Sequence, residues 1–211
     1  MFGDITITQI IIVIGVLLVS LSIHEAMHAF VGLKLGDDTA AEEGRVSLNP
    51  LRHIDPFMTI VLPIITLIIF QAPILAAKPV PFNADRVKFD EFGAALIALA
   101  GPVSNFVLAV LGVVAAKLIG IDVTPLGSVT SYILYTFITL NVSLFVFNMI
   151  PIPPLDGSRV LYAFSPEPLQ RLLAQIEPYG FYIVFGLVLF GGFGQFIRSL
   201  NLSVLNLLGL G

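Results

Sequence analysis

The 211-residue chain contains no cysteine and only three histidines. Without cysteine it has no disulfide bonds, thiol nucleophiles or thiolate metal ligands. Any metal site must therefore use His24, His28, His53 or carboxylates. Charge is also scarce, because only 11% of the residues are charged, whereas soluble domains carry about a quarter. The net charge of −4 provides no basic surface, so nucleic acid is not an expected partner.

Long apolar stretches dominate instead, and 57% of the residues are hydrophobic. About 20 consecutive apolar residues span a bilayer. The stretches lie at residues 5–35, 57–75, 92–119, 128–150 and 179–200. The first has no Lys or Arg before Lys34 and so lacks the basic leader of a secretory signal, which favours a retained membrane helix. We expect residues 1–211 to form a single membrane-embedded domain of the all-α polytopic class, in contact with the lipid bilayer.

The first apolar stretch contains the sequence HEAMH, from His24 to His28. Residues four apart lie on one face of a helix, so the two imidazoles can bind one metal ion. A charged, unpaired side chain in a membrane helix costs about 2.5 kcal/mol or more, which favours a function over a chance match. In the zincin pattern, zinc activates a water molecule and the glutamate removes its proton. We therefore predict one Zn²⁺ per chain and Glu25 as the general base.

A catalytic zinc usually has three protein ligands, so a third ligand is required. Most carboxylates lie in polar loops, but Asp156 ends the proline-rich sequence IPIPPLD that begins at Ile150. Such a sequence cannot form regular helix, and non-helical backbone at membrane depth needs protein or a wet cavity around it. Asp156 is therefore the favoured third ligand, and His53, in a loop, is the weaker candidate.

Further motifs follow HEAMH along the chain. They are GDDTA at 36–40, GRVSLNPLRHIDP at 44–56, AKPVPFN at 77–83, AGPVSN at 100–105 and FNMIPIPPLDG at 147–157. The series resembles the site-2 protease family of intramembrane zinc metalloproteases, in its short form without a PDZ or CBS domain. The resemblance implies His24, His28 and Asp156 as zinc ligands and Glu25 as the catalytic glutamate. The implied activity is that of an endopeptidase that hydrolyses peptide bonds in transmembrane segments of other proteins.

Two asparagines in these motifs are candidate substrate or oxyanion contacts. Asn148 precedes the proline run, where it could donate to the substrate or to the developing oxyanion, or equally cap the helix end. Asn105 could contact substrate or bridge helices, and we favour the structural role. Residues 44–49 alternate polar and apolar side chains, which predicts a short β-like segment whose edge could hold unwound substrate.

The membrane topology is constrained because HEAMH and Asp156 must lie near the same membrane face to bind one metal ion. If residues 57–75 crossed the membrane, the first helix and the helix at 128–150 would be antiparallel, and each side would carry five Lys and Arg. If residues 57–75 re-enter, one side carries Lys34, Arg45, Arg52, Lys78, Arg86, Lys88, Arg159 and Arg171, and the other carries Lys117 and Arg198. Positive charge concentrates in cytoplasmic loops. We therefore predict four full spans, a re-entrant segment at 57–75 and an active site toward the cytosolic face of the cell membrane.

Two other functions compete with proteolysis. Zinc transporters can contain similar motifs, but they usually stack more histidines and acids along a path than this chain has. A non-proteolytic relative would have no need to retain all four of His24, Glu25, His28 and Asp156. Substrate identity and homo-oligomer formation are left open by the sequence.

Overall fold

The structure is a computed structural model that describes residues 6–53, 81, 83–189 and 191–210. All regular elements in these ranges are helices, which confirms the all-α class. They are α1 (Ile7–Lys34), α2 (Thr39–Glu42), η1 (Pro50–Arg52), η3 (Ala84–Arg86), α4 (Asp90–Ile119), α5 (Val129–Asn148), α6 (Asp156–Phe164), α7 (Glu167–Ile176), η4 (Glu177–Tyr179), α8 (Gly180–Leu189) and α9 (Gly191–Leu207).

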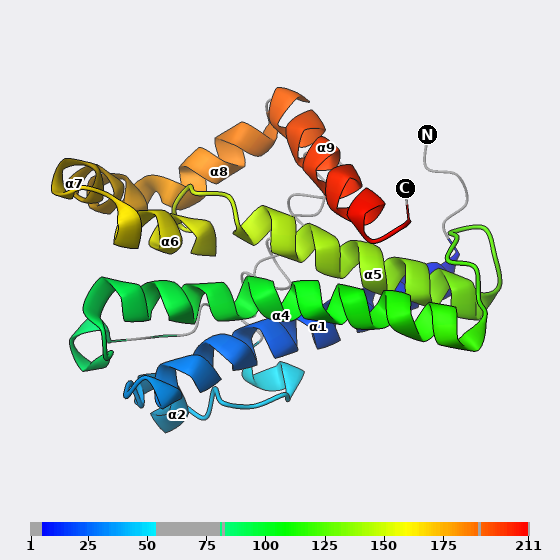
Figure 1. The fold of residues 1–211 in the computed structure, drawn as a ribbon, viewed down its shortest axis with the longest axis horizontal. Helices are drawn as coiled ribbons and strands as arrows, with labels where there is room; N and C mark the ends of the chain where they lie inside the picture. Colours follow the sequence, from blue (N-terminus) through cyan, green and yellow to red (C-terminus); the bar gives the residue numbers. More distant parts are fainter. Residues whose placement is uncertain (1–5, 54–80, 82, 190, 211) are drawn as a thin grey trace.

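Four helical stretches of the described chain are long and apolar enough to cross a membrane: α1, α4, α5 and the run Glu167–Leu189. The number agrees with the four predicted spans, but the last span differs from the predicted 179–200. The described part of α8 extends to Leu189, and α9, from Gly191, runs at a steep angle to α8 and packs on α5 (Figure 1). Glycines at 191, 192 and 194 have low helix propensity, which explains a break inside this apolar run.

Helix α4 packs against both α1 and α5. Figure 1 shows that α1 and α5 run in the same direction and that α4 runs antiparallel to both. The face of α1 that is buried carries small and polar residues, whereas large side chains such as Ile11 and Phe30 are exposed. Such a distribution suits a membrane helix, whose small residues allow close helix packing while its large apolar residues face lipid.

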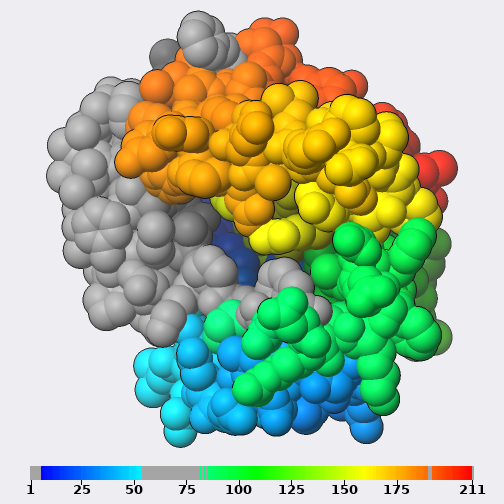
Figure 2. Space-filling model, turned by 90° about the vertical axis from the view of Figure 1, so that its left-hand side faces the viewer, coloured from blue at the N-terminus to red at the C-terminus, as the bar shows by residue number. Residues whose placement is uncertain are grey.

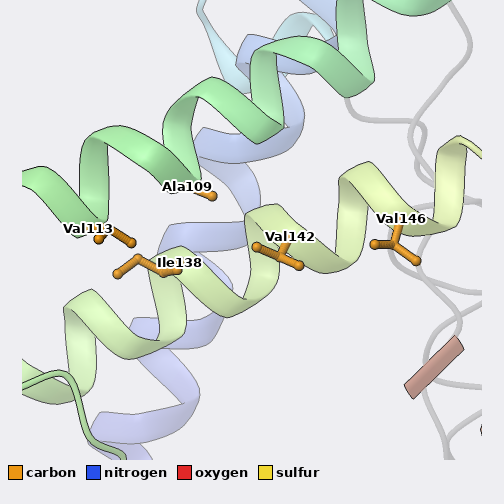
Figure 3. Packing of buried hydrophobic residues seen from close by; sticks show 5 residues of the cluster. All are labelled: Ala109, Val113, Ile138, Val142 and Val146. Carbon is orange, nitrogen blue, oxygen red and sulfur yellow. The ribbon is translucent and has the colours of Figure 1, made fainter. Parts of the chain in front are cut away.

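The apolar core lies between α4 and α5. Figure 3 shows Ala109 and Val113 of α4 facing Ile138 and Val142 of α5, with Val146 further along α5. Residues of α9, including Leu200 and Val204, pack against this cluster. The core therefore fixes α4 and α5 relative to each other, which holds the end of α5 near α1.

The end of α1 is tied to the start of α4 by hydrogen bonds. Lys88 donates its backbone N–H to the carbonyl of Leu35 at 2.9 Å. The buried carboxylate of Asp37 accepts from Thr39 Oγ1 at 2.5 Å, from Thr39 N at 3.1 Å and from Asn83 N at 2.7 Å. Burial alone would raise the pKa of Asp37, but these hydrogen bonds hold it below its ordinary value.

The predicted β-like segment at 44–49 is not confirmed, because these residues form turns and irregular backbone within the described chain. The alternation has a different cause: Arg45 is buried and donates to the carbonyl of Arg52 at 2.6 Å, while Val46 and Leu48 are exposed. The predicted re-entrant segment, residues 57–75, lies outside the described residues.

Candidate metal centre

Helix α1 supplies two of the predicted metal ligands. His24 and His28 are one helical turn apart and both are buried, as is Glu25. The helix begins with a capping box, in which Thr6 Oγ1 accepts from Gln9 N and the Gln9 side chain accepts from Thr6 N. Its apolar sequence continues without Pro to Lys34, so the two imidazoles lie on one regular face.

The third predicted ligand, Asp156, lies far from the two histidines in the sequence but close to them in the structure. Residues 149–155 are non-helical, as the prolines predict, and α6 begins at Asp156. A Cβ on Gly157 would lie 2.3 Å from the carbonyl oxygen of Met149, so only glycine permits α6 to start this close to the end of α5. Because α1 and α5 are parallel, this tight turn brings the Asp156 carboxylate to the second half of α1.

The three predicted ligand atoms converge on one point. His24 Nε2 and His28 Nε2 are 3.0 Å apart, and Asp156 Oδ2 is 3.3 Å from the former and 3.4 Å from the latter. Tetrahedral zinc with bonds of 2.0–2.1 Å requires ligand atoms about 3.3 Å apart. His24, His28 and Asp156 therefore form a group that can hold a metal ion.

Hydrogen bonds at the opposite ring nitrogens fix the tautomer of both histidines. His28 Nδ1 is 2.7 Å from the carbonyl oxygen of Ile97, which can only accept, so Nδ1 carries the proton. His24 Nδ1 is likewise 2.6 Å from Asn105 Oδ1. In the neutral rings both Nε2 lone pairs then face each other, and such an arrangement requires a cation between them.

The surroundings of Asp156 provide an independent test of whether these residues fit a metal ion. Its Oδ2 atom is buried and has no hydrogen-bond partner among the described residues. A buried carboxylate oxygen without a donor is costly unless it binds a cation. Two imidazoles and one carboxylate are also the donor set that zinc accepts in catalytic sites. The residues present therefore fit zinc.

Gly101 of α4 provides the space that the ligand atoms occupy. A Cβ at this position would lie 2.3 Å from His28 Nε2 and 2.6 Å from His24 Nε2. Real Cβ atoms are essentially never found within 3.0 Å of other heavy atoms. Any side chain at position 101 would therefore displace the imidazoles.

The remaining predicted residues have separate surroundings. Glu25 is buried on α1, next to His24. Asn105 is fully buried and bonds to His24, which favours the structural role over substrate contact. Asn148, at the end of α5, donates from Nδ2 to the Leu144 carbonyl at 3.0 Å. His53 bonds to the Ser47 carbonyl at 2.7 Å and is not part of the metal group.

Sequence reasoning missed three residues that surround the site: Ser20, Gly101 and Asn141. Ser20 could have been found from the helical series 20, 24 and 28, which places a polar residue every fourth position of α1. Asn141 is an amide in the interior of an apolar membrane helix, and such residues are rare unless they have a partner. Gly101 gave no signal beyond its place in AGPVSN.

The end of the molecule that carries α6 and α7 is hollowed. Figure 2 shows an opening there between the segments around α6 to α8 and the start of α4, with atoms of α1 visible at its floor.

Comparison with known proteins identifies the family of the chain. The family described as Peptidase family M50 matches residues 117–191, a stretch that includes Asp156. "Putative zinc metalloprotease YwhC" of Bacillus subtilis is 40% identical over 178 residues, which cover 82% of this chain and 77% of YwhC. "Putative zinc metalloprotease Rip2" of Mycolicibacterium smegmatis is 32% identical over 182 residues, which cover 82% of this chain and 65% of Rip2. No solved structure matches the chain.

Proposed function

The chain belongs to peptidase family M50, the site-2 protease family, whose members compared above carry the name "Putative zinc metalloprotease", and we propose that it is an intramembrane endopeptidase. The observation that carries this proposal is the convergence of His24 Nε2, His28 Nε2 and Asp156 Oδ2 within 3.0–3.4 Å. His24 and His28 lie on α1, one of four helical stretches long and apolar enough to cross a membrane, so the chain is an integral membrane protein. The proposed substrates are transmembrane segments of other proteins.

His24, His28 and Asp156 would hold the zinc ion, and Glu25 would handle protons. When bound, zinc lowers the pKa of a water molecule and polarises the peptide carbonyl. Glu25 removes a proton from the attacking water as its oxygen bonds to the carbonyl carbon, and then delivers that proton to the leaving amine as the C–N bond breaks. The burial of Glu25 excludes bulk water, so the proton stays within the site.

Asn148 and Asn105 are proposed to act in different ways. Asn148 is half-buried and its Nδ2 has a second N–H for a substrate carbonyl or the developing oxyanion. Loss of one such donor lowers kcat about 100-fold or more. Asn148→Ala should therefore lower kcat without changing zinc affinity, whereas Asn105→Leu should weaken zinc binding. The reverse pattern would exchange the two assignments.

The proposed topology places the site toward the cytosolic face and residues 57–75 in a re-entrant segment. The hydrogen bond from Lys88 to Leu35 supports this proposal, because it places the end of α1 and the start of α4 at the same end of the molecule. The chain has no cysteine, so single cysteines at the exposed residues Glu43 and Asp85 can be labelled without background. Labelling of both from the cytosolic side supports the topology, and labelling from opposite sides refutes it.

The exposed residues Val46 and Leu48 are the proposed contact for an unwound substrate segment. Proline at either position removes a backbone donor. We expect slower cleavage with unchanged zinc content. Unchanged cleavage by both proline variants would exclude this contact.

The test of the proposed function uses purified protein and its Glu25→Gln variant. Both are loaded with zinc and incubated with a panel of membrane-helix substrates in detergent or liposomes. We expect equal zinc content and cleavage by the native protein alone, because glutamine cannot accept the proton. Equal cleavage by both proteins would refute the mechanism, and zinc movement across liposomes without cleavage would indicate a transporter.

A further inference from the structure

A chain of buried hydrogen bonds links α5 to the metal centre. Asn141 of α5 donates from Nδ2 to the Phe137 carbonyl at 2.8 Å and to Ser20 Oγ at 2.9 Å. Asn105 donates from Nδ2 to Asn141 Oδ1 at 2.9 Å, and its Oδ1 accepts from His24 Nδ1 at 2.6 Å. Asn105, Asn141 and Ser20 are each fully buried, so water does not compete for these bonds.

A backbone carbonyl sets the direction in which these hydrogen bonds are donated. The Phe137 carbonyl can only accept a hydrogen bond, so it selects the NH₂ end of Asn141. The oxygen of Asn141 then faces Asn105 and selects the NH₂ end of that amide. A second, longer hydrogen bond of 3.4 Å from Asn105 Nδ2 to the Ser20 carbonyl favours the same orientation of the Asn105 amide. The oxygen of Asn105 is thereby left facing His24.

This direction decides which nitrogen of His24 can bind a metal. With an amide oxygen opposite, Nδ1 keeps its proton and Nε2 presents a lone pair to the metal site. If the Asn105 amide were reversed, its NH₂ group would face Nδ1 and favour the tautomer with the proton on Nε2. That tautomer cannot bind the metal through Nε2. The tautomer of His28 does not depend on the orientation of an amide side chain, because its Nδ1 donates directly to the Ile97 carbonyl.

We propose that Asn141 is a positioning residue, which through Asn105 fixes the His24 tautomer that the metal requires. The proposal rests on the metal group described above and deepens the proposed function. Among the described residues the side chain of Asn141 hydrogen-bonds Asn105, Ser20 and Phe137, so it acts on the metal site through the orientation of the Asn105 amide. Partners in the outer shell of a metal site usually change metal affinity about 10–100-fold. We expect about tenfold for Asn141, since the bond to the Ser20 carbonyl retains part of the orientation.

The first measurement is the imidazole tautomer in metal-free protein. Protein labelled with ¹⁵N in its three histidines is studied by NMR in detergent at alkaline pH, where the rings are neutral. In the native protein, His24 and His28 should both carry the proton on Nδ1. In Asn141→Leu, the Nε2–H tautomer of His24 should appear, while His28 stays unchanged as the internal control. Asn141→Ala serves the same purpose if the larger side chain prevents folding.

The second measurement is zinc affinity by chelator competition. Asn141→Leu should raise the zinc Kd about tenfold. Ser20→Ala should have a smaller effect, because the Phe137 carbonyl still orients Asn141. Thr136→Val is the matched control: Thr136 is buried on the same helix outside the hydrogen-bond chain, and its variant should bind zinc as the native protein does.

Two results would overturn the proposal. One is a native His24 tautomer and native zinc affinity in both Asn141 variants. The other is an equal change at His24 and His28, because that would show a general loss of packing. Neither result depends on cleavage, so they differ from failure of the proposed function, in which the native protein binds zinc but cleaves no substrate.

Discussion

Substitution of Gly101 by alanine is the sharpest perturbation of the metal centre. The added Cβ would lie 2.3 Å from His28 Nε2, whereas ordinary contacts begin at 3.4 Å. The imidazole or the α4 backbone must therefore retreat by about 1.1 Å, the difference between the two distances. Metal–ligand distances tolerate deviations of about 0.2 Å. The shift is several times that tolerance, so we expect zinc affinity to fall at least about 100-fold.

The assay is zinc content by elemental analysis after dialysis, with Kd from chelator competition. Gly15→Ala is the control, because Gly15 lies on α1 and a Cβ there meets nothing within 4 Å. Circular dichroism should show that both variants remain helical. Native zinc affinity in Gly101→Ala would refute the close approach of α4 to the two imidazoles and with it the geometry of the site.

Three further predictions concern the stability of the protein in detergent, which is measured by thermal unfolding. The folded-state pKa of Asp37 lies below its ordinary value of 3.8, so the ionised carboxylate stabilises the fold when the pH is above 3.8. This contribution is lost as the pH falls through the folded-state pKa. Asp37→Asn should therefore be less stable than the native protein at neutral pH, with a difference that narrows as the pH falls below 3.8; a constant difference would contradict this role. Ile138→Ala should cost about 2–4 kcal/mol, because the side chain is fully buried, and a loss below about 1 kcal/mol would contradict tight packing there. The half-exposed pair Arg159–Glu177 should show a coupling below about 1 kcal/mol in a double-mutant cycle, and a larger value would indicate a more buried pair.

The sequence predicted the metal ligands because their geometry is largely local. The spacing of His24 and His28 alone places them on one helix face. The prolines before Asp156 alone exclude a helix and force a turn. Parallel α1 and α5 were inferred from the need for these groups to meet, and the structure shows them parallel (Figure 1).

Other features depend on tertiary partners that spacing does not reveal. Asn105 had two interpretations until its contact with His24 was known. The alternation at 44–49 suggested a strand, but Arg45 turns inward to bond within its own loop. The apolar run 179–200 suggested one span, although it contains parts of two helices, α8 and α9, and α9, which begins with a glycine-rich sequence, packs on α5.

The central claim is that one zinc ion is held by His24, His28 and Asp156, and zinc-edge X-ray absorption tests it most directly. The account predicts one zinc per native chain, with nitrogen and oxygen ligands at about 2.0–2.1 Å and scattering from two imidazoles. His24→Ala should lose one imidazole contribution or the zinc itself. A native spectrum with fewer than two imidazoles, or one that is unchanged in His24→Ala, would contradict the account.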